Sequence, residues 1–384
     1  VVTVEEAGDD PEEAGGLLGK LWPDGRIHAR FSQLKETARF GSAKPNVQNW
    51  MKKAEGELRR IICDDLKLLE KHFGEGAKFP KLRSVVVPTP GYVFMEADWK
   101  QAEMFALAGL SGDARMWDAL TTPGKDLHDT TALEAFGIKM YGPDGMEVPE
   151  EYMLKLAEND PNWDSPTSEF SKLQKQLIYV DQRGRRLSRK QFKDGIRVSA
   201  KNLNFGIPYG RGAQDIAIQV KAETGSTDTI QSLKEDIDVM MEVWKTQTYP
   251  DAWNYMLECA ETVVDPGVLV NPWGRERIFP PTHDREQIAK MGREAQNFPI
   301  QSTVADTCLI TLKLMVEYRK AHNLHFRIVN QIHDAILLEV PTDEIEQTRT
   351  MFKETMGNIQ IPMPGREPLC LGLDIDVMPN RWAE

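Results

Sequence analysis

Apolar and polar residues follow two different patterns along the chain. The segments "SVVVPTPGYVFMEADW" and "FRIVNQIHDAILLEV" predict two short strands around a Pro-Gly turn and a hairpin over residues 326–340, and the terminal "LCLGLDIDVM" predicts another strand. Helical spacing predominates from "KQAEMFALAGLSGD" to about Val264, and again from about His283 to Asn323. A sheet-bearing part interrupted by a long helical part is therefore expected.

Two segments depart from these patterns. The first twenty residues are acidic and rich in Gly, which predicts a flexible leader or the remnant of a longer chain over residues 1–24. The stretch "YGPDGMEVPEEYMLKLAENDPNWDSPTS" holds many Gly, Pro, Asp and Asn, so we expect a surface insertion there.

Composition narrows the class of protein. The chain has 384 residues, of which 41% are hydrophobic, enough to bury a sizeable core. No apolar run approaches the ~20 residues that span a bilayer, so no membrane partner and a cytoplasmic or nucleoid-associated location are expected. The four cysteines form no C-x-x-C pair, which indicates neither a disulfide framework nor a zinc site.

The charge is unevenly distributed. Against a net charge of -12, residues 26–60 hold nine Lys or Arg and three Glu, and residues 183–201 hold eight Lys or Arg and one Asp. Such basic tracts are compatible with a phosphate-binding surface, although a solvated helix face has the same pattern.

Two acids stand at predicted strand ends. In "YVFMEAD", alternation places Glu96 and Asp98 on one face, with Asp98 at the end, and Asp334 follows His333 in the middle of the predicted hairpin. Two carboxylates brought together by a sheet would repel, and a divalent cation with hard oxygen ligands, such as Mg²⁺, removes that cost. Each carboxylate taken alone is equally compatible with a turn cap.

A second constellation is "RVSAKNLNFGIPYG". Arg197, Lys201, Phe205 and Tyr209 recur every four residues, which places two cations and two aromatic rings along one helical stripe. This stripe suits a polyphosphate and a base, but an amphipathic core helix with a basic end has the same spacing. Pro208 removes a backbone donor and predicts a kink near Asn204.

These segments resemble the motifs of family A DNA polymerases, the bacterial polymerase I type. "ADWKQAEMFALAGLSGD" is similar to motif A, "RVSAKNLNFGIPYG" to motif B and "QIHDA" to motif C. Lesser similarities are "GRIHARF", "ARFGSAKPNVQN", "DLHDTTA", "NPWGRERIFP", "REAQNFPIQSTVAD" and "NRWAE", in the family's order from residue 25 to the end.

The resemblance implies an α+β right-hand fold with an antiparallel palm sheet and a large helical fingers insertion. The expected boundaries are palm at 25–110, fingers at 111–265 and palm again at 266–384. The family carries a thumb, and often an exonuclease, before the "GRIHARF" segment. We expect both to be absent here, and another domain or chain to supply thumb, exonuclease or processivity function.

The resemblance also implies template-directed DNA synthesis from dNTPs on primer-template DNA. Asp98 and Asp334, with the Trp99 carbonyl, would be ligands of two Mg²⁺ ions, for which Mn²⁺ can substitute. The implied dNTP-binding residues are Gln101, Glu103, His128, Arg197, Lys201, Phe205 and Tyr209, with Glu103 obstructing a 2′-hydroxyl and Tyr209 near the templating base. The implied DNA-binding residues are Arg39, Arg293, Asn297, Gln301 and His333.

Four positions depart from the family's pattern. Ala335 stands where the family usually has Glu, Phe105 where it has Arg, Trp99 where it has Tyr and Ser302 where it has Gly. The two essential acids remain. Our hypothesis is that Glu96, two residues before Asp98 on the same face, replaces part of the missing carboxylate.

Several other interpretations remain open. A phage-type single-subunit RNA polymerase has related motifs, although Glu103 and Phe205 favour deoxynucleotides. Ala335 and Phe105 are also compatible with a catalytically weakened DNA-binding module. The patterns Asp374-x-Asp376 and His322-x-x-His325 resemble metal motifs, but we interpret the first as part of a terminal strand and the second as an exposed helix end.

Overall fold

The computed structural model describes residues 20–32, 39–50, 83, 86–182 and 184–382, so residues 1–19 of the predicted leader lie outside the described residues. The chain divides into two compact units. The sheet unit comprises Val1–Ala102, Gln301–Ile361 and Cys370–Glu384, and the helical unit comprises Glu103–Ile300 and Pro362–Leu369.

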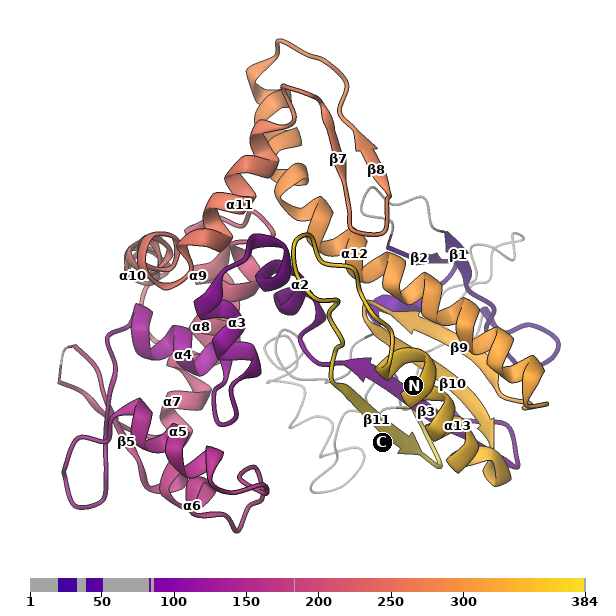
Figure 1. Cartoon of the computed structure of the whole chain (residues 1–384), viewed down its shortest axis with the longest axis horizontal. Coiled ribbons are helices and arrows are strands. Elements are labelled where there is room, and N and C mark those ends of the chain that lie inside the picture. Colours follow the sequence, from indigo (N-terminus) through magenta and orange to yellow (C-terminus); the bar gives the residue numbers. More distant parts are fainter. Residues whose placement is uncertain (1–19, 33–38, 51–82, 84–85, 183, 383–384) are drawn as a thin grey trace, which may run out of the picture. The chain divides into compact units, whose positions relative to one another are not determined.

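A four-stranded antiparallel sheet forms the centre of the sheet unit, in the order β11-β3-β10-β9 (Figure 1). Its strands are β3 (Tyr92–Trp99), β9 (Arg327–Ile332), β10 (Ala335–Pro341) and β11 (Leu373–Met378). The predicted hairpin and terminal strand are therefore confirmed. The predicted strand before the Pro-Gly turn is wrong in its described part, because residues 86–89 pair with no strand.

The two faces of β3 have different neighbours. Phe94 packs with Trp50 and Trp382 in a buried cluster, whereas the indole of Trp99, on the other face, donates to the Met356 carbonyl at 3.0 Å. Because alternate residues of a strand point to opposite faces, Asp98 belongs to the Phe94 face. The remaining elements of this unit are β1 (Arg30–Ser32), β2 (Gly41–Ala43), η2 (Val47–Asn49), η5 (Thr342–Glu344), α13 (Ile345–Phe352) and η6 (Lys353–Gly357).

Helices make up most of the helical unit. They are α2 (Ala102–Ser111), which begins at the last residue of the sheet unit, α3 (Ala114–Thr121), α4 (Leu127–Ala135), α5 (Glu150–Glu158), α6 (Glu169–Gln176), α7 (Arg189–Asp194), α8 (Ile196–Gly206), α9 (Ala213–Thr224), α10 (Ile230–Val243), η4 (Trp244–Thr248) and α11 (Pro250–Glu261). The predicted helical region is thus confirmed. The expected surface insertion was only partly right, because it contains helix α5, with Met153 and Ala157 buried.

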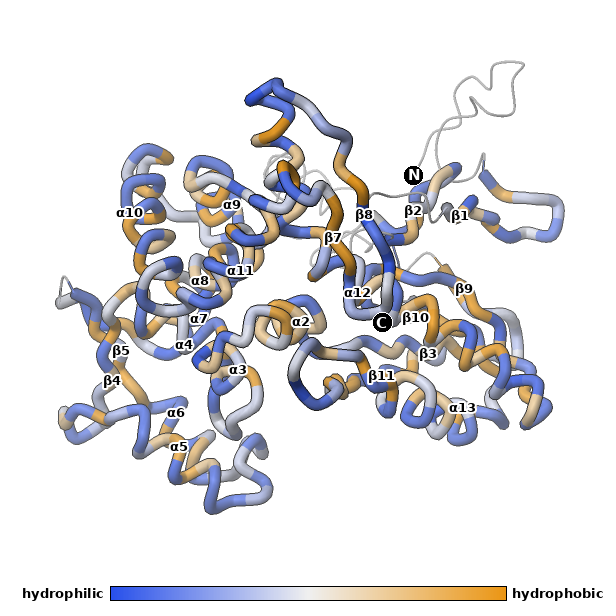
Figure 2. Tube along the Cα trace, turned by 45° about the horizontal axis from the view of Figure 1, so that its top comes forward, coloured by the Kyte–Doolittle hydropathy of each residue, from blue (hydrophilic) through white to orange (hydrophobic). Residues whose placement is uncertain are grey.

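The helical unit also contains strands that the sequence did not predict. β4 (Lys139–Tyr141), β5 (Ile178–Val180) and β6 (Arg186–Ser188) form a three-stranded sheet. β7 (Val268–Val270) pairs with β8 (Glu276–Ile278). Figure 2 shows hydrophobic residues along β7, whereas β8 has charged residues followed by Ile278. Strands of three residues are too short to show an alternating pattern.

The long helix α12 (Arg285–Ala321) confirms the helix predicted over residues 283–323. The boundary between the units, at residues 300 and 301, lies inside it. The first boundary lies between residues 102 and 103. The palm and fingers boundaries that the resemblance implies stay predictions.

Candidate active site

Hairpin β9–β10 turns through only two residues, His333 and Asp334. Ile332 and Ala335 are directly paired, and His333 has a φ of 57°. Two-residue hairpin loops need a positive φ to match the strand twist, and a residue with a side chain adopts it only at a cost in free energy. The local backbone therefore presents Asp334 at the end of the hairpin.

Asp334 lies beside Asp98. Asp98 is paired with Ala335 across strands β3 and β10, and the Asp98 and Asp334 carboxyl groups are within hydrogen-bonding reach. Burial raises the pKa of Asp334, and its hydrogen bonds and the charge of Arg39 offset this only in part. Two acids from sequence segments more than 230 positions apart thus form one half-buried pair.

Side chains of the sheet unit form hydrogen bonds that hold the hairpin turn in place. The His333 carbonyl accepts hydrogen bonds from Gln331 Nε2 and, at 3.5 Å, from Cys308 Sγ. Gln48 Nε2 in turn donates to the Gln331 carbonyl at 2.6 Å, and Gln48 Oε1 accepts from the Ser42 backbone at 3.0 Å. The "GSAKPNVQN" segment therefore braces the turn that carries Asp334.

Charged groups surround the turn. Burial lowers the pKa of His333, and the nearby guanidinium groups of Arg39 and Arg83 lower it further. Burial raises the pKa of the Cys308 thiol, with a smaller contribution from the Asp334 charge. His333 is therefore predominantly neutral near pH 7, as the direction of its shift requires.

Glu96 lies on the same face of β3 as Asp98, as predicted. Its Oε2 accepts a hydrogen bond from Trp382 Nε1 at 2.9 Å, and 6% of the residue is exposed. This contact connects Glu96 to the terminal "NRW" segment, a neighbour that the sequence did not indicate. Its auxiliary metal role stays a prediction.

Helix α8 and the residues after it carry the predicted nucleotide-binding stripe. Lys201, Phe205 and Tyr209 line one cavity of about 220 Å³. The helix ends at Gly206, so Tyr209 lies beyond it, and the kink predicted near Asn204 was wrong because Pro208 follows the end of the helix. The hydroxyl of Tyr209 donates to Glu103 Oε2, which brings together two residues that the resemblance assigned to one nucleotide.

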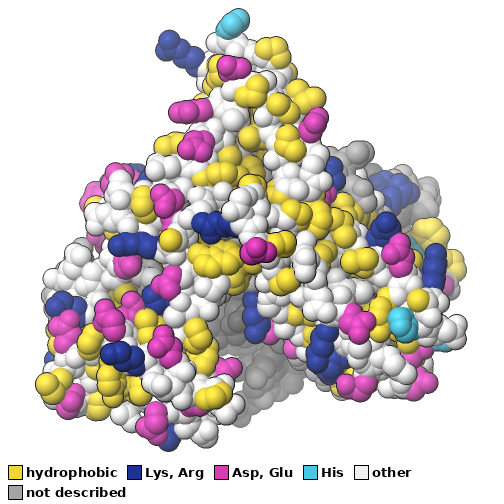
Figure 3. Space-filling view, viewed as in Figure 1, with side chains coloured by type: hydrophobic (Ala, Val, Ile, Leu, Met, Phe, Trp, Pro, Cys, Tyr) yellow, Lys and Arg dark blue, Asp and Glu magenta, His cyan; other side chains and the backbone are white. Residues whose placement is uncertain are grey.

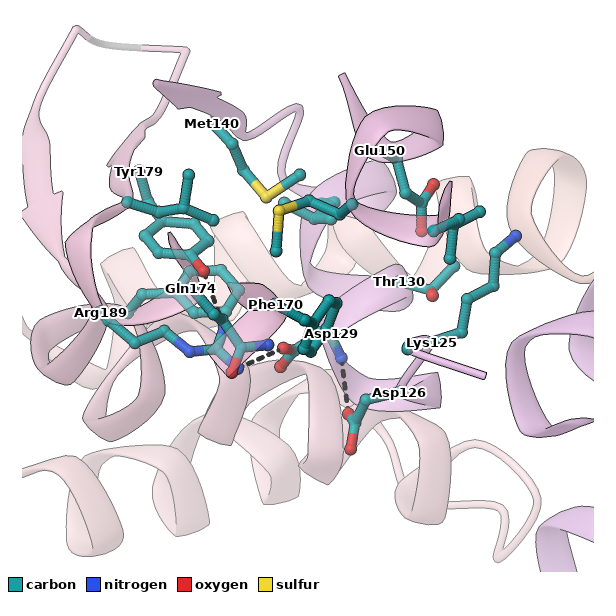
Figure 4. Close-up of a pocket in the computed structure, with 16 residues that line it drawn as sticks. Lys125, Asp126, Asp129, Thr130, Met140, Glu150, Phe170, Gln174, Tyr179 and Arg189 are labelled. Atoms are coloured by element: carbon teal, nitrogen blue, oxygen red, sulfur yellow. Dashed lines mark hydrogen bonds and ion pairs between the residues drawn. The ribbon is translucent and has the colours of Figure 1, made fainter. Parts of the chain in front are cut away.

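Arg197 is held by two carboxylates at the start of helix α4: Asp126, its N-cap, and Asp129 in its first turn. Its Nε donates to Asp129 Oδ1 at 2.7 Å, and its NH2 group contacts Asp126 Oδ2 at 2.8 Å. Asp129 also pairs with Arg189, whose other nitrogen donates to the Tyr179 hydroxyl (Figure 4). Burial disfavours the charge of Asp126, but Arg197 and a backbone N–H outweigh it and lower its pKa.

Asp126 and Asp129 were not among the predicted site residues. They could have been found from the "DLHDTTA" segment, in which Asp126 and Asp129 lie one helical turn apart on either side of His128. On the face drawn in Figure 3, acidic and basic side chains intermingle over the helical unit. The basic tract of residues 183–201 is thus partly neutralised by ion pairs, of which Arg185 with Asp181 is another.

His128 is buried on α4, where 6% of the residue is exposed. Its ring lies 5.6 Å from the Phe205 ring, and its Nδ1 lies 3.0 Å from Asn204 Nδ2. Burial lowers its pKa to about 4. The charge of Asp126 opposes this shift, while Arg197 and Lys201 add to it.

The remaining predicted residues are distributed over both units. Gln301 is buried in the sheet unit, and Gln101 has a φ of 51° just before helix α2. In the helical unit, the Asn297 side chain donates to the Arg293 carbonyl at 3.4 Å, one turn earlier on α12. Phe105, which replaces the family's Arg, packs edge to face on Trp117 at 6.2 Å.

The two metal-like patterns have ordinary partners. Asp374 pairs with Lys100 at 2.9 Å, while His322 contacts the Tyr318 carbonyl and His325 contacts Glu344. Within the described part of the chain, no three His, Cys, Asp or Glu side chains gather as a metal cluster. In the same part, no helix has the length and apolar character needed to cross a membrane.

Comparison with known sequences decides the family. The sequence model of DNA polymerase family A matches residues 15–144 and 181–371 of this chain. The chain belongs to DNA polymerase family A. Among its relatives, the DNA polymerase I of Lactococcus lactis is 25% identical over 91% of this chain and 31% of its own length. The chloroplastic and mitochondrial DNA polymerase I A of Arabidopsis thaliana is 26% identical over 95% of this chain and 29% of its own length.

A solved family structure has the same fold. It is described as the POL domain of Pol1 from M. smegmatis in complex with DNA primer-template and dNTP, and it matches with a TM-score of 0.63 at 24% identity. The match covers 95% of this chain and 50% of that one. The chain thus spans about three tenths of these two relatives and half of this neighbour.

Proposed function

We propose that this chain carries the catalytic part of a DNA-dependent DNA polymerase, which transfers a nucleotidyl group from a dNTP to a primer 3′-hydroxyl. The observation that carries the proposal is the half-buried pair of Asp98, near the end of strand β3, and Asp334, in the turn just before the adjacent antiparallel strand β10. Membership of family A supports this reaction class. In this proposal the sheet unit is the palm and the helical unit is the fingers.

The donor set fits magnesium. Mg²⁺ retains water and is held by one or two carboxylates together with substrate phosphates, and Asp98 and Asp334 are two such carboxylates side by side. The Trp99 carbonyl is the proposed third ligand from the chain. When bound, two such ions, or Mn²⁺ in their place, favour deprotonation of the 3′-hydroxyl and neutralise charge on the triphosphate.

The helical unit supplies the proposed nucleotide contacts. Arg197, Lys201 and His128 would hold the triphosphate by charge and hydrogen bonds. Gln101, the residue before α2, is a further proposed contact and belongs to the sheet unit. Phe205 and Glu103 would border the sugar, and Tyr209 would stack near the templating base. The shared cavity of Lys201, Phe205 and Tyr209 and the bond between Tyr209 and Glu103 support these roles.

Primer-template DNA is the proposed macromolecular partner. The structural neighbour is described as a complex with DNA primer-template and dNTP, and the braced turn of His333 places an imidazole next to the proposed metal ligands. Arg39, Gln301 and His333 in the sheet unit, and Arg293 and Asn297 in the helical unit, are the proposed DNA contacts. Polar and cationic side chains of this kind contact phosphates and the minor groove.

Extension of a labelled DNA primer tests the proposal. With Mg²⁺ and a DNA template, we expect the chain to add dNTPs in the order that the template dictates and to add NTPs much more slowly, because Glu103 obstructs the 2′-hydroxyl. Equal or preferential use of NTPs would instead indicate an RNA polymerase. DNA binding without any extension would indicate a non-catalytic module.

A further inference from the structure

A buried network of polar side chains surrounds Asn204 in the helical unit. Asn204 is fully buried on α8, between Lys201 and Phe205. Its partners are His128 and Thr131 on α4 and Trp244 at the start of η4. Because a buried amide without hydrogen-bond partners costs free energy, each of these contacts limits which donors and acceptors the other contacts can use.

Trp244 determines which way the Asn204 amide points. Its indole Nε1 lies 2.8 Å from Asn204 Oδ1, and an indole nitrogen can only donate. The oxygen of Asn204 therefore faces Trp244. The amide nitrogen faces His128 Nδ1 at 3.0 Å and Thr131 Oγ1 at 2.9 Å.

Thr131 completes the network consistently. Its Oγ1 lies 2.7 Å from the Leu127 carbonyl, 3.1 Å from Asn204 Oδ1 and 3.0 Å from the Tyr249 hydroxyl. We assign its hydrogen to the Leu127 carbonyl, the shortest of these contacts, so that Oγ1 accepts from Asn204 Nδ2 and from Tyr249. In this arrangement the side-chain N–H and O–H hydrogens of Trp244, Asn204, Thr131 and Tyr249 each have an acceptor. With the amide turned over, the indole of Trp244 would face an NH₂ group and lose its acceptor.

We propose that Asn204 is a positioning residue that fixes the tautomer of His128: Nδ1 accepts from the Asn204 amide, so the ring proton lies on Nε2 and donates to the triphosphate. The role toward the triphosphate rests on the proposed function. The tautomer itself does not, because it follows from Trp244, Asn204 and Thr131 alone.

The surroundings of His128 favour a neutral donor. The groups that act on its charge are Asp126 at the N-terminus of α4 and Arg197 and Lys201 on α8, and the imidazole is buried with a pKa of about 4. Protonation at Nδ1 would also place an N–H against the N–H of Asn204. A neutral Nε2–H therefore donates to an anion without titrating near pH 7, while Arg197 and Lys201 supply the positive charge.

Nitrogen-15 NMR of the histidine-labelled, nucleotide-free chain tests the tautomer directly. Long-range proton–nitrogen correlations distinguish the two neutral tautomers and the imidazolium, and the His128→Gln variant identifies the signal. We expect an unprotonated Nδ1 and a protonated Nε2 near pH 7. An Nδ1–H tautomer or an imidazolium in the wild type would overturn the proposal, whatever the polymerase activity.

Substitution of Asn204 tests the function of the tautomer. Asn204→Asp keeps the shape but replaces the donor with a carboxylate that attracts a proton to Nδ1. Trp244→Phe removes the indole that orients the amide, in case Asn204→Asp does not fold. The matched control is Asn159→Asp, since the exposed Asn159 only donates to the Lys155 carbonyl of α5.

The readout is the dissociation constant of a dNTP, measured by titration, so that it does not depend on turnover. We expect Asn204→Asp to move the proton to Nδ1 and to weaken dNTP binding by roughly tenfold or more, the effect of a hydrogen bond to a charged group. The control should change neither. A proton that moves without a change in dNTP affinity would overturn the proposal, whereas a wild type that binds dNTP without extending primers would overturn only the proposed function.

Discussion

Tyr209 donates a hydrogen bond to Glu103, although the two residues are 106 positions apart. Tyr209 follows the end of α8, and Glu103 lies in the first turn of α2. Because the acceptor is a carboxylate, this is one of the stronger kinds of side-chain hydrogen bond. The bond holds Glu103, which we assign to sugar selection, next to Tyr209, whose ring we assign to the templating base.

Removal of the Tyr209 hydroxyl should weaken discrimination against ribonucleotides. The Tyr209→Phe variant keeps the ring but frees Glu103 to move away from the sugar. We expect the preference for dNTP over NTP, measured as the ratio of kcat/KM values, to fall by about tenfold, the effect of one charge-assisted bond. Glu103→Ala should lower the ratio at least as far. An unchanged ratio in Tyr209→Phe would show that Glu103 needs no such support.

Two substitutions at His333 should separate its backbone role from its side-chain role. Both His333→Gly and His333→Ala remove the imidazole, but only Gly adopts a positive φ without strain. We expect Ala to be about 1 kcal/mol less stable than Gly in urea unfolding, with equally weakened primer binding in both. Primer binding that is normal in the Gly variant would assign His333 a purely structural role.

Substitution of Glu96 tests whether it replaces the carboxylate that the family usually has at the position of Ala335. If Glu96 assists the metal site, Glu96→Gln should raise the Mg²⁺ concentration needed for half-maximal extension, because a charged oxygen ligand is lost. Trp382→Phe is the matched control, since it removes the indole donor and retains the carboxylate. An unchanged Mg²⁺ requirement in Glu96→Gln, with a loss of stability in both variants, would limit Glu96 to holding Trp382.

His128 should make the folded state sensitive to acid. Its pKa is about 4 in the folded chain against 6.5 when unfolded, so the unfolded chain binds the proton more tightly. The stability that the folded chain gains from a neutral His128 is therefore fully present above about pH 6.5 and is lost as the pH falls towards 4. Between pH 7 and 5 we expect the wild type to lose on the order of 2 kcal/mol more than His128→Gln in urea unfolding. Equal losses would mean that His128 binds a proton as readily in the folded chain as in the unfolded chain.

The sequence predicted those parts of the site that lie on long or regular elements. Alternating apolar residues around His333 and Asp334 defined both strands and the loop of the hairpin, so Asp334 could be placed at a strand end. Asp98 followed from the same rule on β3. That the two strands are neighbours came from the resemblance, because no local pattern specifies which strands pair.

Contacts between distant segments could not be predicted in the same way. The bond from Gln48 to Gln331 joins residues 283 positions apart, and a single glutamine in a loop carries no signal for it. Asn204 was visible within motif B, but its partner Trp244 stands 40 residues later with nothing to connect them. Tyr209 extended the helical spacing, although Pro208 limits α8 to residues before it.

The most direct test of the central claim compares two aspartates that are close to Asp98 in the sheet. Asp334→Asn removes a proposed metal ligand, whereas Asp374→Asn changes an exposed acid that is paired with Asp98 across β11 and β3 and bound to Lys100. In primer extension at saturating DNA and dNTP, we predict that Asp334→Asn loses on the order of 10³-fold or more in rate with DNA binding retained, and that Asp374→Asn stays within a few-fold of the wild type. A rate for Asp334→Asn within about tenfold of the wild type, or an equal loss in Asp374→Asn, would contradict the assignment of catalysis to Asp98 and Asp334.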